Sequence, residues 1–152
     1  MRNPIRLIWA VAFIALVSSE KAQAHAGDHR TLAELDAMYT QYPNIITAKE
    51  PISSFLTHEG LSIYHVRISD NPNSNEAGEP NVLYSAIHHA REPMSLMETI
   101  FYMWYLLENY GTDDEVTYLV DNMQMIFVPC INVDGYKYNE QIEPNGGGMW
   151  RK

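Results

Sequence analysis

One short segment, Ile87–Pro93, carries an imidazole and a carboxylate at a spacing that suits a metal ion. His89 and Glu92 are three residues apart, and three residues in a helical turn place two side chains on the same side. A neutral imidazole and a carboxylate can supply two of the ligands of a tetrahedral zinc ion. The spacing therefore predicts a partial metal site, whose third ligand must come from a distant segment.

The same residues have an ordinary explanation, because a His and a Glu at this spacing often form a hydrogen-bonded pair on a protein surface. His88 is also a second possible ligand. Adjacent side chains on a strand point to opposite faces, so one histidine can face the site while the other packs away. The residues alone leave open which of the two binds.

The segment stands between an apolar strand predicted at 81–87 and a long apolar helix predicted at 94–109. Open α/β sheets bind their ligands at the carboxyl ends of strands, which is where this segment lies. The helix is apolar nearly all round, which predicts burial against a sheet. The candidate site is therefore expected to be held by a strand on one side and a buried helix on the other.

The remaining elements come from periodicity, turn residues and capping patterns. Further strands are expected at 45–56, 61–69 and 123–131, and residues 58–60 and 70–80 are expected to form a turn and a surface loop. Helices are expected from capping boxes at Thr31–Glu34 and Thr112–Glu115, and residues 132–152 read as loop. This order predicts an α/β fold with a mixed β-sheet flanked by helices.

Composition narrows the classes of function. Of the 152 residues, 46% are hydrophobic, which is enough for a packed core. Ten Lys and Arg stand against nineteen Asp and Glu, a net charge of −9, which argues against binding to nucleic acid or to an anionic membrane surface. The single cysteine, Cys130, lies in an apolar run and is expected to be a buried thiol.

The first 24 residues have the pattern of an export signal. Arg2 and Arg6 precede an uncharged apolar run at 7–17, and Ala22–Ala24 fits the small-x-small cleavage pattern. We therefore expect a signal peptide at 1–24, a polar tail at 25–30 and a secreted or periplasmic protein without a stable membrane anchor after cleavage. An uncleaved anchor is the alternative.

Three signatures in order, His88–Pro93 after an apolar strand, Asn132–Tyr136 and Met149–Lys152, together resemble the zinc carboxypeptidase family of the carboxypeptidase A and B type. The resemblance covers roughly residues 31–152. It implies the zinc-carboxypeptidase fold, of which this stretch is the N-terminal part of a truncated catalytic domain, roughly its first half.

The resemblance also implies roles for particular residues. His89 and Glu92 match the first two ligands of one Zn²⁺ ion, Arg91 matches a substrate-binding arginine, and Arg151 matches the catalytic arginine that stabilises negative charge on the scissile carbonyl oxygen. The implied substrates are peptide or protein C-termini, from which a zinc-activated water releases single amino acids. The family's third ligand and general-base glutamate fall beyond Lys152, so the isolated chain is expected to be inactive.

Asn132–Tyr136 is expected to be architectural, with its Asp-Gly pair in a tight turn of positive φ.

Two other functions remain as alternatives to a carboxypeptidase. One is a related zinc amidase or deacylase that acts on cell-wall peptides or acylated amino acids. The other is a non-catalytic peptide-binding module of the same fold.

Overall fold

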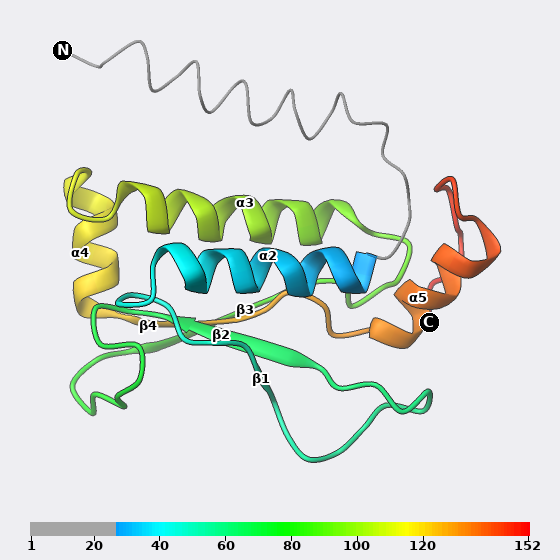
Figure 1. Ribbon diagram of the computed structural model, residues 1–152, viewed down its shortest axis with the longest axis horizontal. Helices are drawn as coiled ribbons and strands as arrows, with labels where there is room; N and C mark the ends of the chain where they lie inside the picture. The colour runs from blue at the N-terminus through cyan, green and yellow to red at the C-terminus, as the bar shows by residue number, and fades with distance from the viewer. Residues whose placement is uncertain (1–26) are drawn as a thin grey trace, which may run out of the picture.

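A mixed sheet covered by a layer of helices makes up the fold (Figure 1). The computed structural model describes residues 27–152, with side chains from Thr31 onward. The sheet has the spatial order β1-β2-β4-β3, formed by β1 (Glu50–Pro51), β2 (Tyr64–Ile68), β3 (Asn81–Ser85) and β4 (Gln124–Val128). β2 is antiparallel to β1 and β4, whereas β3 and β4 are parallel. The predicted α/β class with a mixed sheet is confirmed.

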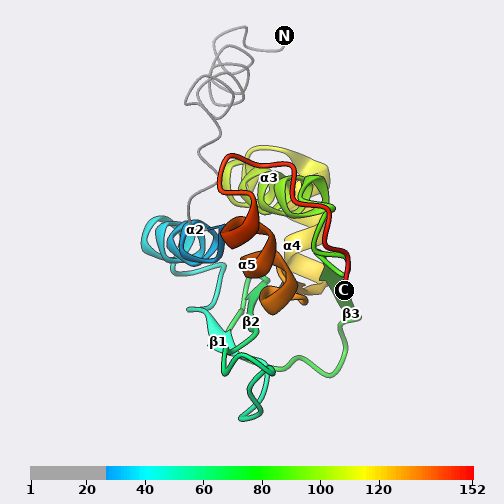
Figure 2. The same cartoon turned by 90° about the vertical axis from the view of Figure 1, so that its right-hand side faces the viewer.

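The helices are α2 (Gly27–Gln41), α3 (Met94–Asn109), α4 (Asp114–Asn122) and α5 (Val133–Ile142). α2 and α3 lie side by side over one face of the sheet (Figures 1 and 2). α3 and α4 together connect β3 to β4, because parallel neighbours need a crossover rather than a hairpin. Within residues 27–152, no helix combines the length and the apolar character that crossing a membrane requires.

The main core lies between these helices and the sheet. Phe127 of β4 is fully buried and stacks on Tyr84 of β3, with ring centroids 4.8 Å apart and planes 10° from parallel. Other buried side chains come from every layer: Leu35, Met38, Ile46, Val66, Ile68, Met103, Leu106, Leu107, Val116, Val120 and Met125. This packing fixes β3 and β4 next to each other, so the segments that follow them leave the same edge of the sheet.

The strand predicted at 45–56 is wrong over most of its length. Ile46 makes only an isolated bridge to Ile68, and β1 is two residues long. Pro51 has no N–H to donate to a ladder, and the chain beyond it extends into solvent with Phe55 exposed. The turn predicted at 58–60 is confirmed, with Gly60 at φ +75°.

The predicted burial of strand 81–87 and of helix 94–109 is right for one face of each. β3 is an edge strand, and its Leu83 is 64% exposed. α3 buries Leu96, Met103, Trp104, Leu106 and Leu107 but exposes Met94, Met97, Phe101 and Tyr105. Each element packs on one side only within the described part of the chain, so its other apolar face meets solvent.

Two predictions about the N-terminal region differ from the structure. α2 already begins at Gly27, so residues 27–30 are helical rather than a tail, and the predicted capping box at Thr31–Glu34 lies inside the helix. Glu34 instead accepts a 3.0 Å hydrogen bond from Trp104 Nε1, which ties α2 to α3. The predicted signal peptide and residues 25–26 lie outside the described residues.

Two other helix starts also differ from the sequence prediction. Asp113, not Thr112, caps α4, and its Oδ1 accepts from the backbone N–H groups of Glu115 at 3.0 Å and Val116 at 3.1 Å. α5 occupies residues that were predicted to be loop. The Asn132 side chain caps it by accepting from Gly135 N at 3.0 Å, so the expected turn of positive φ is wrong.

An acidic cluster lies in the loop at the amino end of β3. Carboxylate oxygens of Asp70, Glu76 and Glu79 all lie within 4.8 Å of one another. Glu79 Oε2 is buried and has no hydrogen-bond partner among the described residues. Partial burial and the charges of Glu76, Asp70 and Asp121 raise the pKa of Glu79 above its ordinary value.

Replacement of Glu79 by glutamine should therefore stabilise the fold at pH 7. A raised pKa means that the folded state holds the proton more tightly than the unfolded state, so wild-type stability falls as pH rises from the ordinary value of 4.5 through the raised one. Urea denaturation at several pH values should show a weaker fall for Glu79→Gln, whereas Glu98→Gln on α3 should follow the wild type. An unchanged pH dependence in Glu79→Gln would contradict the expected repulsion.

Candidate functional site

The candidate site begins where β3 and β4 end at one edge of the sheet. The backbone segments that follow β3 and β4 stay side by side, because Ala86 N donates to Val128 O at 3.1 Å and Ile131 N donates to Ala86 O at 3.1 Å. Asn132 N then donates to Ile87 O at 3.0 Å. The segment with the two histidines is thus held by the segment that leads into α5.

Ile87 has an unusual backbone conformation. Its φ is +50°, and it is the one non-glycine residue with positive φ among residues 27–152. A β-branched side chain is strained in this region, at a cost of about 1–3 kcal/mol. Ile87 is fully buried in a small cluster with Leu96, Cys130 and Val133, so the surrounding packing maintains the strained turn. The chain therefore bends sharply just before His88.

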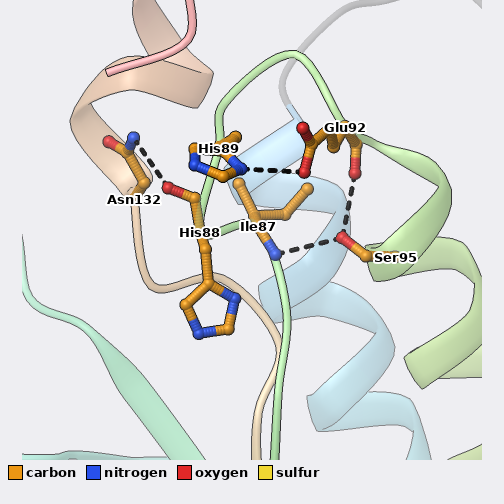
Figure 3. A network of polar contacts seen from close by, with 6 residues as sticks. All are labelled: Ile87, His88, His89, Glu92, Ser95 and Asn132. Carbon is orange, nitrogen blue, oxygen red and sulfur yellow. Dashed lines mark hydrogen bonds and ion pairs between the residues drawn. The ribbon is translucent and has the colours of Figure 1, made fainter.

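His89 and Glu92 come together in the turn that follows (Figure 3). His89 Nδ1 lies 3.0 Å from Glu92 Oε2, and Glu92 N donates to His89 O at 3.0 Å, which closes the turn. Both side chains are accessible, at 37% and 54% exposure. Two donors of one tetrahedral zinc ion, each at about 2.0–2.1 Å, are about 3.3 Å apart, so this nitrogen and oxygen fit a shared ion with only a small opening of the pair.

His88 is directed elsewhere. Its ring points away from His89 and Glu92 (Figure 3), and its Nε2 lies 3.4 Å from Ser85 Oγ. The two adjacent histidines do face opposite ways, although they stand in a turn after β3 rather than on the strand itself. Geometry therefore favours His89 as the partner of Glu92.

Among residues 31–152, whose side chains the structure describes, no third His, Cys, Asp or Glu joins this pair in a group that could hold a metal ion. The acidic cluster of Asp70, Glu76 and Glu79 lies at the amino end of β3, the opposite end from the His89–Glu92 turn. Two ligand atoms alone hold zinc weakly, since zinc sites in proteins take three or four protein ligands.

Both predicted functional arginines are close to the His89–Glu92 turn: Arg91 is part of it, and the backbone of Arg151 contacts it. Arg91 is exposed within the His89–Glu92 turn. Ala90 N donates to Arg151 O at 3.1 Å, so the segment carrying Arg151 runs beside that turn although Arg151 is 61 residues after Ala90 in sequence. The structure thus brings the first and third sequence signatures together at the backbone level.

Asn139 of α5 holds that segment in place. Its Nδ2 donates to Trp150 O at 2.8 Å, and its Oδ1 accepts from Trp150 N at 2.9 Å. Asn139 is only 7% exposed, and Tyr138 packs edge-on against the Trp150 ring at 5.1 Å. A Cβ on Gly148 would lie 2.6–2.8 Å from the Asn139 side chain, so the close approach requires glycine there. The sequence analysis missed Asn139.

The second signature is architectural, as predicted, but through contacts that the sequence did not indicate. Asp134 Oδ1 accepts from Thr57 Oγ1 at 2.6 Å, and its Oδ2 accepts from Glu59 N at 3.3 Å, which ties the long β1–β2 connection to α5. A Cβ on Gly135 would lie 2.5 Å from Lys152 O and 2.9 Å from Ala90 Cβ. Glycine therefore permits the three signatures to meet.

The family model described as zinc carboxypeptidase matches residues 31–152. The chain belongs to the zinc carboxypeptidase family.

Relatives and solved structures agree with this assignment. The chain is 36% identical to human carboxypeptidase D over 101 residues, which is 66% of this chain and 7% of that protein. It is 29% identical to a zinc carboxypeptidase of Saccharothrix mutabilis subsp. capreolus over 122 residues, which is 80% of this chain and 27% of the relative. Carboxypeptidase A from Helicoverpa armigera has the same fold, with a TM-score of 0.68 at 24% identity over 98% of this chain and 36% of that chain.

This chain therefore spans well under a third of these two curated relatives. Another relative, of 34% identity over 100 residues (64% of this chain and 16% of that protein), is an inactive metallocarboxypeptidase of Sclerotinia sclerotiorum. Membership of the family consequently establishes the fold and the class of protein, and the activity needs its own argument.

Proposed function

We propose that this chain supplies part of the catalytic centre of a zinc-dependent carboxypeptidase that removes single amino acids from peptide or protein C-termini. The observation that carries the proposal is the 3.0 Å approach of His89 Nδ1 to Glu92 Oε2 in a turn whose backbone also contacts Arg151. These are the residue types that such a centre uses, placed at the edge of the sheet where α/β folds bind ligands.

His89 and Glu92 would hold one Zn²⁺ ion, with the remaining protein ligand from outside residues 31–152. When bound, zinc polarises a substrate carbonyl and lowers the pKa of a water molecule. His89 Nδ1 and Glu92 Oε2 now share a hydrogen bond, and the nitrogen would have to give up its proton to bind zinc; the bond already brings the two donor atoms within reach of one ion. The short turn orders both donors with little loss of conformational entropy, because their separation in sequence is only three residues.

The two arginines would act on the substrate. Arg91, exposed in the turn, would bind a peptide carbonyl oxygen by charge-assisted hydrogen bonds. Arg151 would face the negative charge that develops on the scissile carbonyl oxygen, and a fixed cation there lowers the barrier. Ala90 N holds the carbonyl oxygen of Arg151, and Asn139 holds the backbone of the neighbouring Trp150, so the segment that carries the cation would be ordered before substrate arrives.

Peptides of identical sequence with a free or an amidated C-terminus test the reaction class. A complete domain that carries this sequence should release one C-terminal residue from the free acid, as followed by mass spectrometry, and none from the amide. A chelator should stop the release. Cleavage of acylated amino acids or cell-wall peptides with both C-terminal peptides left intact would instead identify an amidase or deacylase.

The isolated chain should behave differently from the complete domain. We expect the 152-residue chain to bind zinc weakly and to hydrolyse no C-terminal peptide, since two ligands without a base do not complete the centre. Measurable hydrolysis by the purified chain would overturn this part of the proposal.

A second candidate is a peptide-binding module without catalysis, which the inactive relative of 34% identity brings into consideration. It predicts that a complete domain binds C-terminal peptides in calorimetry but leaves them uncut in the presence of zinc.

Export is part of the leading proposal, because residues 1–24 have the pattern of a signal peptide. Mass spectrometry of the exported protein should find a chain that begins at His25.

A further inference from the structure

The hydroxyl of Ser95 joins three structural elements at the candidate site (Figure 3). Ser95 lies in the first turn of α3, and its Oγ donates to Glu92 O at 2.9 Å. The same Oγ accepts from Ile87 N at 3.1 Å. One side chain thus connects the chain after β3, the His89–Glu92 turn and the start of α3.

The hydrogen bond from Ile87 N to Ser95 Oγ gives the backbone N–H of the strained residue a partner. Ile87 is fully buried and has φ +50°, so its N–H cannot pair with water and points outside any strand ladder. Ser95 Oγ supplies the acceptor, while Ile87 O accepts from Asn132 N at 3.0 Å on the other side. Because buried backbone groups need partners, the two contacts together stabilise a conformation that isoleucine otherwise avoids.

The second contact closes the turn that carries the ligand pair. A serine hydroxyl has one hydrogen, and here it goes to Glu92 O, which leaves the oxygen lone pairs to accept from Ile87 N. The Ser95 hydroxyl thus donates one hydrogen bond and accepts another. α3 has no side-chain cap from Pro93, so Ser95 is the hydroxyl that anchors this turn to the helix start.

We infer that Ser95 is a positioning residue for the His89–Glu92 pair: it holds Ile87 in its left-handed conformation and fixes the backbone of Glu92. Ser95 acts on the pair only through these backbone groups. For its effect on metal binding, the inference rests on the proposed function; for its effect on the turn, it does not.

Nuclear magnetic resonance of the full 152-residue chain without metal tests the effect on the turn. In Ser95→Ala, the backbone coupling and chemical shifts of Ile87 should leave the left-handed range, and hydrogen exchange of its amide should become at least about tenfold faster. Ser95→Thr keeps the hydroxyl and should retain the wild-type values. Should Ser95→Ala not fold, Ser95→Cys, with a weaker donor and acceptor, should fall between the wild type and full loss.

Zinc titration of a complete domain that carries this sequence, against a chelator of known affinity, tests the effect on the pair. Ser95→Ala should lower zinc affinity about 10- to 100-fold, as loss of outer-shell support does at other metal sites, and Ser95→Thr should restore it. Thr99→Val is the matched control, because Thr99 Oγ1 donates to Ser95 O at 2.8 Å within α3 and lies one helical turn further along that helix than Ser95. That control should bind zinc as the wild type does.

The two measurements separate the possible failures. Ile87 that keeps its left-handed conformation and slow exchange in Ser95→Ala, or a Ser95→Thr variant that behaves as alanine does, would overturn the inference. A complete domain that carries this sequence and binds no zinc would contradict the proposed function instead, and the metal-free measurement would still decide the role of Ser95.

Discussion

Zinc affinity should fall by more than about 100-fold when His89 is replaced by alanine in a complete domain that carries this sequence, and should stay unchanged in His88→Ala. Loss of an outer-shell partner alone costs about 10- to 100-fold, so loss of a ligand must cost more. The expectation follows from the geometry, since His89 Nδ1 lies 3.0 Å from Glu92 Oε2 whereas the His88 ring lies toward Ser85. Competition with a chromophoric chelator measures both variants.

The matched pair makes this test specific. Both variants remove one imidazole from adjacent, accessible positions, so general damage to the fold should affect them alike. Glu92→Gln should resemble His89→Ala, because the amide keeps the size of the side chain but removes its charge. Equal losses in His88→Ala and His89→Ala, or a loss confined to His88→Ala, would contradict the assignment.

The second large effect is expected at Arg151. Arg151→Ala should lower kcat for a C-terminal peptide by about 10²–10³-fold, the range found when a group that stabilises an oxyanion is removed. KM should change little, because the contact is made mainly in the transition state. Arg151→Lys should recover part of kcat, since lysine keeps the positive charge without the planar pair of donors.

Arg67→Ala is the control for loss of a positive charge. Arg67 lies on β2, and its Nη1 donates to Ser74 O at 2.7 Å in the loop before β3, away from the candidate site. This variant should keep wild-type kcat. A drop in kcat/KM that comes entirely from KM in Arg151→Ala would assign Arg151 to substrate binding rather than to stabilisation of the carbonyl oxygen.

Periodicity and turn chemistry were sufficient for the central elements. β3, α3, α4 and β4 lie close to the predicted ranges because their patterns are strong and their lengths ordinary. The His89–Glu92 turn also lies at the end of a strand as expected, since the contacts that form it are local. The family resemblance is confirmed by the family model that matches residues 31–152.

Tertiary contacts explain what the sequence analysis missed. Asn132 caps α5 and also contacts the chain after β3, whereas an Asn-Val-Asp-Gly run by itself indicates a turn. The positive φ of Ile87 depends on Ser95 and Asn132, and no local propensity favours it in isoleucine. Asn139 shows its role only once α5 exists, because the clamp on Trp150 needs a helix to aim the amide.

The exposed apolar faces of β3 and α3 also depend on tertiary contacts rather than on local sequence. Leu83 and the outer side of α3 have compositions typical of a core, yet within residues 27–152 nothing covers them. Composition reports what a residue prefers, and burial depends on which neighbours are present. The prediction of burial was therefore right in kind for these elements and wrong for their outer faces.

Anomalous diffraction at the zinc absorption edge, from crystals of a complete domain that carries this sequence, tests the central claim most directly. A shared ion predicts one strong anomalous peak at about 2.0–2.2 Å from both His89 Nδ1 and a Glu92 carboxylate oxygen. A zinc-loaded crystal with no peak between these two side chains, or with a peak ligated by His88, would contradict it.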